Sequence, residues 1–451
     1  MHLSGAELSI FWVIPFVGML LSTAICPLVA PHFWERHYGK AAVGWGLAFL
    51  LPCAAVFGPE LALYQAWHTL LLEYLPFVIL LFALFTVAGG ISQSCPFTGK
   101  PGVNTAMLLA GTLLASFMGT TGAAMLFIRP LLKANEHRKH KTHTVVFFIF
   151  LVANIGGGLT PLGDPPLFLG FLRGVPFFWT AVHLAVPVIF MSSLLLLVYF
   201  ILDTWLWIRE GRPLLPEDVP NCGQRGRIYL QGKINFLFLL VIIGVVLISG
   251  SNWAAAWGSV TLYHVELGWR EIFRNAGLLV MAALSLRFTS YESRLLNGFN
   301  WEPIAEVAKI FLGIFLSMIP AIAILQAGEE GVLAPLLSLV SHNGQPVNNM
   351  YFWSCGLLSA FLDNAPTYVV FFNTAGGDVA QLTGELSPTL AAISVGAVFM
   401  GAATYIGNAP NFMVRSIAER HGVKMPSFFG YMIWSAAILG PGFIALSLFY
   451  F

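Results

Sequence analysis

Charged residues are scarce in this sequence. Only 10% of its 451 residues are Asp, Glu, Lys or Arg, whereas 57% are hydrophobic and the mean hydropathy is +0.79. A soluble globular protein carries about 25% charged residues, and a surface that faces water cannot be covered with so few. The composition therefore excludes a soluble globular protein and predicts a chain that crosses a lipid bilayer many times.

The sequence also lacks an excess of charge of either sign, and it lacks paired cysteines. Its 22 Lys and Arg against 21 Asp and Glu leave a formal net charge of +1, so no nucleic-acid partner is expected. Motifs of zinc proteases, P-loop ATPases and dinucleotide enzymes are missing, so we expect no enzyme and no cofactor. The cysteines form no C-x-x-C pair, so we expect neither a disulfide framework nor a zinc site. They are Cys26, Cys53, Cys95, Cys222 and Cys355.

Apolar runs, by contrast, are abundant, and a membrane span needs roughly 20 mostly apolar residues. Two runs, 104–132 and 349–373, are interrupted by polar residues near their middle, and we interpret each as a re-entrant hairpin. The fold class that we expect is an all-α polytopic membrane protein with ten spans and two hairpins. The spans are expected at about 8–30, 41–58, 71–92, 143–170, 180–208, 234–252, 272–288, 304–327, 388–420 and 427–450.

The basic residues agree with this arrangement. All but three of the 22 Lys and Arg fall in loops on one side, which is cytoplasmic by the positive-inside rule. Both termini are then outside and the 210–233 linker is cytoplasmic. Hairpin 104–132 opens to the cytoplasm and hairpin 349–373 to the outside, in what we expect to be a bacterial inner membrane. The three exceptions are Arg173, Arg270 and Arg274.

One of the cytoplasmic loops is rich in histidine. Residues 136–143 carry three histidines among Lys and Arg side chains, and histidine titrates near neutral pH. The loop is therefore either a pH sensor or an ordinary positively charged cytoplasmic loop, and the second interpretation is the simpler one.

An internal repeat occurs at a fixed offset of 244 residues. Residues 160–169 read TPLGDPPLFL and residues 404–413 read TYIGNAPNFM, which share Thr, Gly, Pro and Phe. The same offset superimposes the two hairpin interruptions. Each half, 1–209 and 234–451, then holds five spans and one hairpin, and because five is odd the second half is expected to be inverted. Inverted repeats with broken helices are typical of secondary transporters, whose site lies near the membrane midplane.

Both repeated segments must unwind inside the membrane. The glycines at 156–158, followed by Pro161, Pro165 and Pro166, cannot continue a helix. In hydrocarbon, each unpaired backbone group costs several kcal/mol, so irregular backbone survives only beside protein or a polar cavity. Four interrupted elements that converge would form an ion site. The alternative is ordinary kinks in a packed helix bundle.

Asp164 and Asp363 lie in these interruptions at membrane depth, where an ionisable side chain indicates function. A buried carboxylate that binds a proton and a metal ion in turn has the chemistry of antiport, so we expect both to couple ions and to ligate transported sodium. The alternative is that each only caps a half-helix. Oxygen-bearing and glycine residues nearby are expected to line the site. These are Thr120, Thr121, Asn154, Thr160, Gly163, Asn364, Thr367, Thr404, Gly407, Asn408 and Asn411.

These segments resemble the ion transporter superfamily, which contains NhaD-type sodium/proton antiporters, arsenite permeases and citrate or dicarboxylate transporters. Residues 154–164 (NIGGGLTPLGD) are similar to the Asn-x-Gly-Gly…Thr-Pro-x-Gly-Asp stretch of the antiporters, and residues 361–366 (FLDNAP) are similar to their Asp-Asn-x-Pro hairpin. The resemblance implies a scaffold region and a transport region, often in a homodimer, with Asp164 and Asp363 as coupling carboxylates. The chain departs from the pattern in two ways. It lacks the Ser-Asn-Thr hairpin tips of the carboxylate transporters, and prolines rather than hydroxyl residues follow Asp164.

We therefore expect a sodium/proton antiporter that works by alternating access. Two acids without a basic residue favour cations, since two like charges 4 Å apart repel by about 4 kcal/mol at an effective dielectric of 20. A sodium- or proton-coupled symporter of citrate or another organic anion is the alternative, with a channel or a structural membrane protein as a third. The expected partners are the lipid bilayer and a small ion or organic anion.

Overall fold

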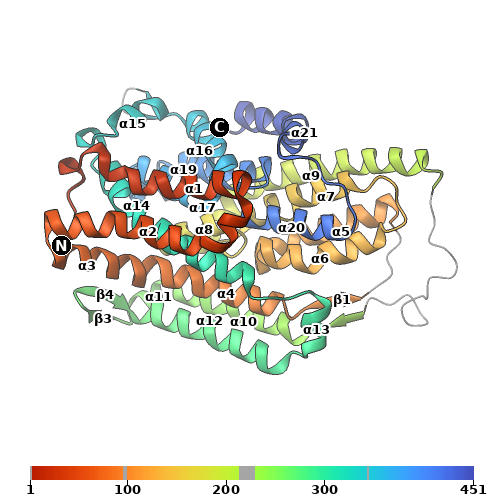
Figure 1. The fold of residues 1–451 in the computed structure, drawn as a ribbon, viewed down its shortest axis with the longest axis horizontal. Coiled ribbons are helices and arrows are strands. Elements are labelled where there is room, and N and C mark those ends of the chain that lie inside the picture. The colour runs from red at the N-terminus through yellow and green to blue at the C-terminus, as the bar shows by residue number, and fades with distance from the viewer. Residues whose placement is uncertain (1–2, 95–98, 213–228, 343–344) are drawn as a thin grey trace.

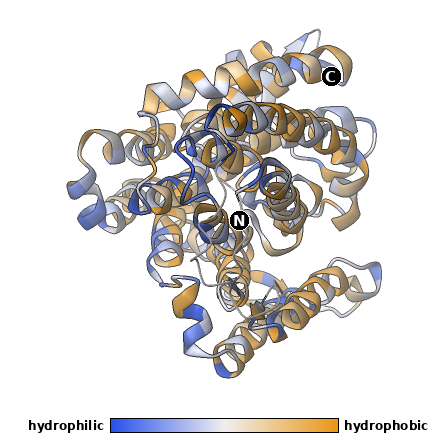
Figure 2. Ribbon diagram, turned by 90° about the vertical axis from the view of Figure 1, so that its right-hand side faces the viewer, coloured by the Kyte–Doolittle hydropathy of each residue, from blue (hydrophilic) through white to orange (hydrophobic). Residues whose placement is uncertain are grey.

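The computed structural model describes residues 3–94, 99–212, 229–342 and 345–451. Cys95, Cys222 and most of the predicted 210–233 linker lie outside the described residues. Long helices run roughly along one axis of the molecule (Figure 1). They are seen nearly end-on in Figure 2, where hydrophobic residues colour most of the helical ribbon.

Helices make up both halves of the chain. The first half contains α1 (Ile14–Val29), α2 (Pro31–Phe57), α3 (Pro59–Thr69), α4 (Leu75–Ala88), α5 (Pro101–Met118), α6 (Thr120–Ala134), α7 (Thr142–Leu151), α8 (Pro165–Leu172) and α9 (Phe177–Arg209). The second half contains α10 (Ile234–Ser249), α11 (Asn252–Ala255), α12 (Trp269–Phe288), α13 (Tyr291–Leu296), α14 (Glu302–Gln326), α15 (Ala334–Val340), α16 (Asn348–Phe361), α17 (Asn364–Thr374), α18 (Val379–Thr383), α19 (Ser387–Met400), α20 (Ala409–Arg420) and α21 (Phe428–Phe449).

Strands are few and short in the part of the chain that the structure describes. They form three antiparallel pairs at the ends of helices, each with two strands. The pairs are β1 (Ser92–Ser94) with β2 (Tyr229–Gln231), β3 (Ser259–Leu262) with β4 (Val265–Gly268), and β5 (Ser341–His342) with β6 (Gln345–Pro346).

Eight helical stretches of the described residues are long and apolar enough to cross a membrane, and two more, Ile234–Ser249 and Ser387–Ala403, are apolar but shorter. The chain is therefore an all-α polytopic membrane protein, as its sequence predicts. The eight stretches are Ile10–Pro27, Pro31–Phe57, Pro59–Ala88, Pro101–Met118, Thr142–Leu159, Phe177–Arg209, Glu302–Gln326 and Phe428–Phe449.

Two helices begin earlier than the sequence predicts. α2 begins at Pro31 rather than near residue 41, and a π-helical turn at Leu70–Tyr74 joins α3 to α4, so that this helical stretch begins at Pro59 rather than near residue 71. Both starts have proline in the first turn, where its missing N–H costs no helical hydrogen bond. The polar residues that follow each proline hid these extensions in a search for apolar runs.

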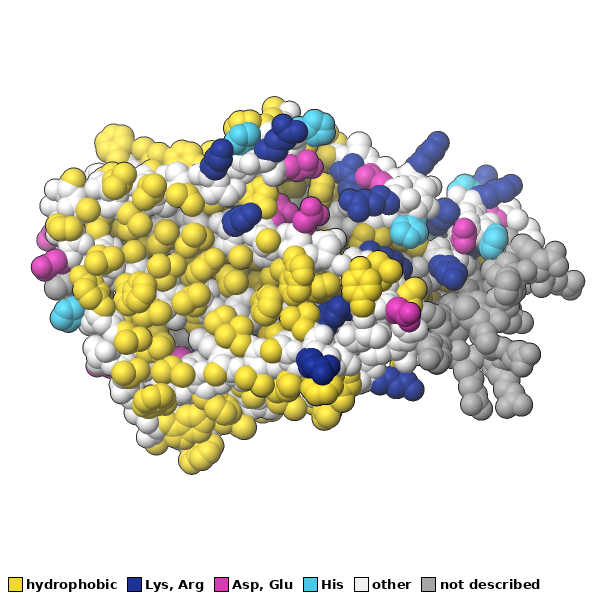
Figure 3. All heavy atoms as spheres, turned by 60° about the horizontal axis from the view of Figure 1, so that its bottom comes forward, with side chains coloured by type: hydrophobic (Ala, Val, Ile, Leu, Met, Phe, Trp, Pro, Cys, Tyr) yellow, Lys and Arg dark blue, Asp and Glu magenta, His cyan; other side chains and the backbone are white. Residues whose placement is uncertain are grey.

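The surface has the character that a lipid environment requires. Figure 3 shows a broad hydrophobic surface on the left of the view, with most of the visible Lys and Arg side chains toward the right. Large apolar side chains such as Val182, Ile433 and Leu448 are 70 to 73% exposed. In water such a surface would be an aggregation liability, whereas in a membrane it contacts lipid tails.

The helices form two packed groups. The scaffold bundle consists of α1–α4, α10 and α12–α14. In it α14 packs on α1 and α2, α12 packs on α4 and α10, and Arg294 of α13 donates to the carbonyl oxygen of Thr86 in α4. The site bundle consists of α5–α9 and α16–α21, in which α5 packs on α6 and α9, and α16 packs on α19. Each half of the chain contributes its first helices to the scaffold bundle and its later helices to the site bundle. The bundles meet where α4 contacts α6 and α8, and where α14 contacts α17.

The two predicted hairpins belong to the site bundle. α5 and α6 pack against each other and are joined at Gly119, whose φ of +80° suits glycine. They lie toward the end of the molecule at which α9 ends, whereas α16 and α17 lie nearer the other end (Figure 1). The inversion of the second half and the boundaries of the repeats stay predictions.

Candidate functional site

Two helices of the site bundle are broken, one between α7 and α8 and the other between α19 and α20. In the first break, a Cβ added to Gly163 would lie 2.2 Å from the carbonyl oxygen of Gly157. In the second break, a Cβ added to Gly407 would lie 2.6 Å from the carbonyl oxygen of Gly401. Backbone therefore touches backbone in both breaks, which explains why glycine is needed at positions 163 and 407.

A threonine holds each break against its neighbouring hairpin. Thr160 donates a hydrogen bond to the carbonyl oxygen of Ser116 in α5, and Thr404 donates one to the carbonyl oxygen of Ala360 in α16. Each hydroxyl also accepts the backbone N–H two residues further along, at 3.2 Å. The two donors, Thr160 and Thr404, are 244 residues apart, and so are the two acceptors, Ser116 and Ala360. These predicted site residues therefore satisfy backbone groups rather than contact the central carboxylate.

Asp164 lies at the centre of the site bundle with 1% of its surface exposed. Its Oδ1 accepts hydrogen bonds from Thr120 Oγ1 at 3.2 Å and from Asn408 Nδ2 at 3.1 Å. Its Oδ2 accepts one from Asn364 Nδ2 at 2.6 Å. Among the described residues, no Lys or Arg forms an ion pair with Asp164. The carboxylate is thus surrounded by neutral donors from both hairpins and from the second break.

The prolines that follow Asp164 explain why its carboxylate faces these donors. Asp164 occupies the N-cap position of α8, where an aspartate normally accepts a backbone N–H of the first turn. Pro165 and Pro166 have no N–H, and the side chain of Asp164 makes no capping bond. The capping alternative is therefore wrong for Asp164.

Asp363 behaves differently, although the same kind of interruption carries it. Its Oδ1 accepts the backbone N–H of Ala365 at 3.1 Å, so Asp363 caps α17. Thr367 donates to the backbone carbonyl of Asp363 at 2.9 Å, which is a local bond within the helix. Asp363 and Thr367 therefore lie beside the centre without a hydrogen bond to Asp164. These contacts favour the capping alternative for Asp363, and they do not test its predicted role in ion coupling.

A chain of asparagines connects Asp164 with both breaks. Asn408 Nδ2 lies 3.2 Å from Asn154 Oδ1, and Asn154 Nδ2 donates to Asn411 Oδ1 at 2.7 Å. Asn411 Nδ2 in turn donates to the carbonyl oxygen of Thr404 at 2.9 Å. All three asparagines are at most 2% exposed. They couple the position of the carboxylate to the geometry of the second break.

One oxygen in the centre has no partner. Asn364 is fully buried, and its Oδ1 forms no hydrogen bond within the described structure. A buried acceptor without a partner costs about 1–3 kcal/mol, and this one belongs to the same amide that donates to Asp164. Amide, hydroxyl and carboxylate oxygens from Asn364, Thr120 and Asp164 are suitable ligands for a hard cation. The arrangement can therefore bind a cation without a basic residue to oppose it.

Four helices begin at this centre. α6 begins at Thr120, α17 at Asn364, α8 at Pro165 and α20 at Ala409, and within each pair the starts are 244 residues apart. Helix N-termini carry partial positive charge, so they stabilise a carboxylate, either that of Asp164 or that of a bound anion. Thr121, next to Thr120, is half-buried and forms no side-chain hydrogen bond among the described residues.

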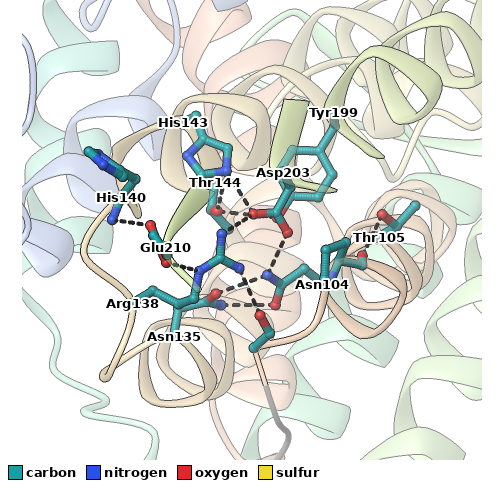
Figure 4. Close-up of polar contacts among 12 residues, drawn as sticks. Asn104, Thr105, Asn135, Arg138, His140, His143, Thr144, Tyr199, Asp203 and Glu210 are labelled. Carbon is teal, nitrogen blue, oxygen red and sulfur yellow. Dashed lines mark hydrogen bonds and ion pairs between the residues drawn. The ribbon is translucent and has the colours of Figure 1, made fainter. Parts of the chain in front are cut away.

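The structure also brings together residues that the sequence did not single out. Asp203, near the end of α9, is fully buried, and its Oδ1 lies 2.7 Å from Arg138 and 2.9 Å from Nε2 of His143 (Figure 4). Asn104 donates to its Oδ2 at 3.0 Å, and Glu210 pairs with Arg138 at 2.8 Å. The cluster ties the base of the α5–α6 hairpin to α9.

This cluster corrects the interpretation of residues 136–143 as an ordinary charged loop. Lys139 and His140 are exposed, as such a loop requires, but Arg138 is 5% exposed and His143 is 2% exposed. Asp203 supplies the buried counter-charge that offsets the cost of removing Arg138 from water. The only signal in the sequence was an acid, Asp203, inside the apolar run 180–208. Because Asp203 lies near the end of that run, it looked like a surface residue.

Comparison with known proteins agrees with a transporter. The profile of a family described as "Putative citrate transport" matches residues 5–451. Two curated proteins from two strains of Mycobacterium tuberculosis, each called an uncharacterized transporter, are 25% identical to this chain over 334 residues. The alignment covers 71% of this chain and 70% of each relative.

Proposed function

The chain belongs to the transporter family described as "Putative citrate transport", and from this membership we propose that it is a secondary transporter whose coupling cation binds at Asp164. The exchange that we propose is sodium against protons by alternating access. The observation that most supports it is the buried Oδ1 of Asn364, which has no partner and belongs to the amide whose Nδ2 donates to the carboxylate of Asp164.

Sodium suits this centre because sodium is a hard cation that prefers oxygen ligands. Asp164 supplies the negative charge, while Asn364 and Thr120 supply neutral oxygens. A proton on the carboxylate and a sodium ion beside it compete for the same negative charge, so occupancy by one disfavours the other. Competition of this kind at a site open to one side at a time is sufficient for exchange.

Cation-coupled symport of citrate or another organic anion is the second candidate. Two observations favour it: the description of the family and the four helix N-termini that meet at the centre. The partial positive charge at helix N-termini stabilises a carboxylate without a basic side chain. On this proposal a cation at Asp164 binds first and offsets the repulsion between the carboxylate and the substrate.

Proteoliposomes that contain the purified protein and a trapped pH dye separate the two candidates. For exchange, we expect a sodium gradient to move protons in the absence of citrate, and Asp164→Asn to abolish that movement. If protons or sodium move only when citrate is present, exchange is wrong and symport is supported. Expression and a gel-filtration profile equal to those of the unmodified protein show that the variant is folded.

The membrane context is part of the proposal. We place the basic loops in the cytoplasm of a bacterium and both termini outside, because the positive-inside pattern favours that orientation. Accessibility of a C-terminal tag to protease in intact cells tests this orientation. The homodimer that the family resemblance implies is tested by the mass of the protein in detergent, for example by light scattering.

A further inference from the structure

Within the described ranges of the chain, three polar side-chain contacts join the scaffold bundle to the site bundle. Arg129 of α6 donates to the backbone carbonyl of Asn297. Arg173, at the end of α8, forms an ion pair of 2.8 Å with Glu73. Gln326, the last residue of α14, donates to Asn373 Oδ1 of α17 at 2.9 Å. Each contact joins the scaffold bundle to an element that carries part of the ion centre.

The contact of Arg129 is specific in its geometry. Asn297 ends α13, and Gly298 follows it with a φ of +58°. A Cβ added to Gly298 would lie 2.2 Å from a terminal nitrogen of Arg129, so the guanidinium packs directly on this turn. Among the described residues Arg129 forms no ion pair. The position of Arg129 is therefore held by the backbone of the turn that joins α13 to α14.

Two of the contacts occupy equivalent places in the halves of the chain. Arg129 and Asn373 are 244 residues apart, and each lies on the second helix of a hairpin. Their partners, Asn297 and Gln326, lie at opposite ends of α14. α14 has 25 residues and is about 37 Å long at 1.5 Å per residue. A single scaffold helix thus separates the points at which the two hairpins are held.

The third contact reaches the ion centre through a short rigid element. Asp164 precedes α8 and Arg173 follows it, with 8 helical residues between them. Glu73 lies in the π-helical turn Leu70–Tyr74, and π-turns inside long helices are often found at functional sites. The ion pair therefore links the helix that positions Asp164 to an irregular turn of the scaffold bundle.

We propose that these three contacts are latches that hold the two bundles in the arrangement of this structure, and that transport requires their release. The inference rests on the proposed function, because alternating access moves one bundle against the other around a fixed site. A contact that exists in only one arrangement favours that arrangement by its own free energy. Weakening any latch therefore shifts the population toward the other arrangement, in the same direction for all three.

The test measures the distance between the bundles by double electron–electron resonance in a background without cysteines. One spin label replaces Tyr291 in the scaffold bundle, and the other replaces Lys133 at the end of α6; both residues are exposed. Glu73→Gln, Arg129→Gln and Gln326→Ala each break one latch. Glu419→Gln is the matched control, because Glu419 pairs with Arg415 at 2.9 Å within α20 and joins no bundles.

We expect each latch variant to change the ratio of the two distance populations about two- to fivefold, as the strength of half-exposed polar pairs suggests. The control should leave the ratio unchanged, and the double variant Glu73→Arg with Arg173→Glu should restore it. Distances in the latch variants that equal those of the control overturn the proposal. If Arg129→Gln does not fold, the distances measured in Gln326→Ala, a change at an exposed residue, still test the proposal.

These distances are recorded without sodium or citrate, so they do not depend on the identity of the substrate. A shift in the latch variants of a protein that exchanges no sodium leaves the latches standing and contradicts the sodium proposal. If the protein exchanges sodium but its latch variants show no shift in distance, the latch proposal is wrong and the sodium proposal is supported.

Discussion

Asn364 and Asp164 are hydrogen-bonded through their side chains at 2.6 Å, although 200 residues separate them in the chain. Thr120 and Asp164 in the first half correspond at the offset of 244 to Asn364 and Asn408 in the second. The centre is thus made of two equivalent pairs, and only one of its four residues carries a charge. On the proposal that the centre binds a small cation, Asp164 supplies the negative charge and the other three residues supply neutral groups.

The two aspartates are expected to differ when each is changed to asparagine. Asp164→Asn removes the charge from the centre and should abolish sodium-driven proton movement in proteoliposomes. Asp363→Asn should retain it, because asparagine caps a helix as well as aspartate does. Loss of exchange in Asp363→Asn, with an unchanged melting temperature, would show that Asp363 is a coupling carboxylate after all.

Asn364→Ala should weaken sodium binding. It removes the hydrogen bond to Asp164 and the oxygen that has no partner. A hydrogen bond to a charged group contributes about 1.5–3 kcal/mol, so the sodium concentration at half-maximal exchange should rise about tenfold or more. Thr367→Ala is the control, since Thr367 bonds only to the backbone of its own helix. Equal sodium dependence in the two variants would remove Asn364 from the site.

The sequence was sufficient to locate this centre, for physical reasons. Glycine and proline cannot continue a helix, and a lone acid is costly in the membrane, so Asp164 and the break that carries it stood out. The offset of 244 then pointed to Asn364 and Asn408. Their hydrogen bonds to the carboxylate of Asp164 are found in the structure.

Other features required the folded chain. Asp164 and Asp363 both precede a helix, and the folded chain shows that Asp363 accepts the backbone N–H of Ala365 whereas the carboxylate of Asp164 accepts side-chain donors from other elements. Asp203 and Arg138 are 65 residues apart without a motif, so their pairing could not be read from spacing. The contacts between the scaffold bundle and the site bundle depend on which helices pack together. Hydropathy along the sequence does not show this packing.

Asp203→Ala should destabilise the protein strongly. It removes the acceptor of His143 and one of the two carboxylates that pair with Arg138, and removing one partner of a buried ion pair costs about 3–5 kcal/mol. Thermal unfolding in detergent should therefore show a lower melting temperature. Glu419→Ala is the control, because Glu419 is 44% exposed, its partner Arg415 lies in the same helix, and such pairs contribute about 0–1 kcal/mol. A melting temperature equal to that of the control would show that the cluster is not needed for stability.

Gly163→Ala should damage transport through sterics alone. The added methyl group would lie 2.2 Å from the carbonyl oxygen of Gly157, so the backbone at Gly163 must move away from the backbone at Gly157. The carbonyl of Gly163 also accepts the N–H of Thr120 at 2.9 Å, and Asp164 is the next residue. Separation therefore displaces both the carboxylate and the tip of the α5–α6 hairpin.

Gly44→Ala provides the comparison, because a Cβ at this position of α2 meets nothing within 4 Å. Alanine in a helix interior is about 0.5–1 kcal/mol more favourable than glycine, so this variant should melt at the same temperature or slightly higher and exchange sodium normally. Gly407→Ala, in the second break, should resemble Gly163→Ala, since its Cβ would lie 2.6 Å from the carbonyl oxygen of Gly401. Normal exchange in both break variants would mean that the close backbone contacts are dispensable. If Gly163→Ala loses exchange and Gly407→Ala keeps it, only the first break, which carries Asp164, is needed for transport.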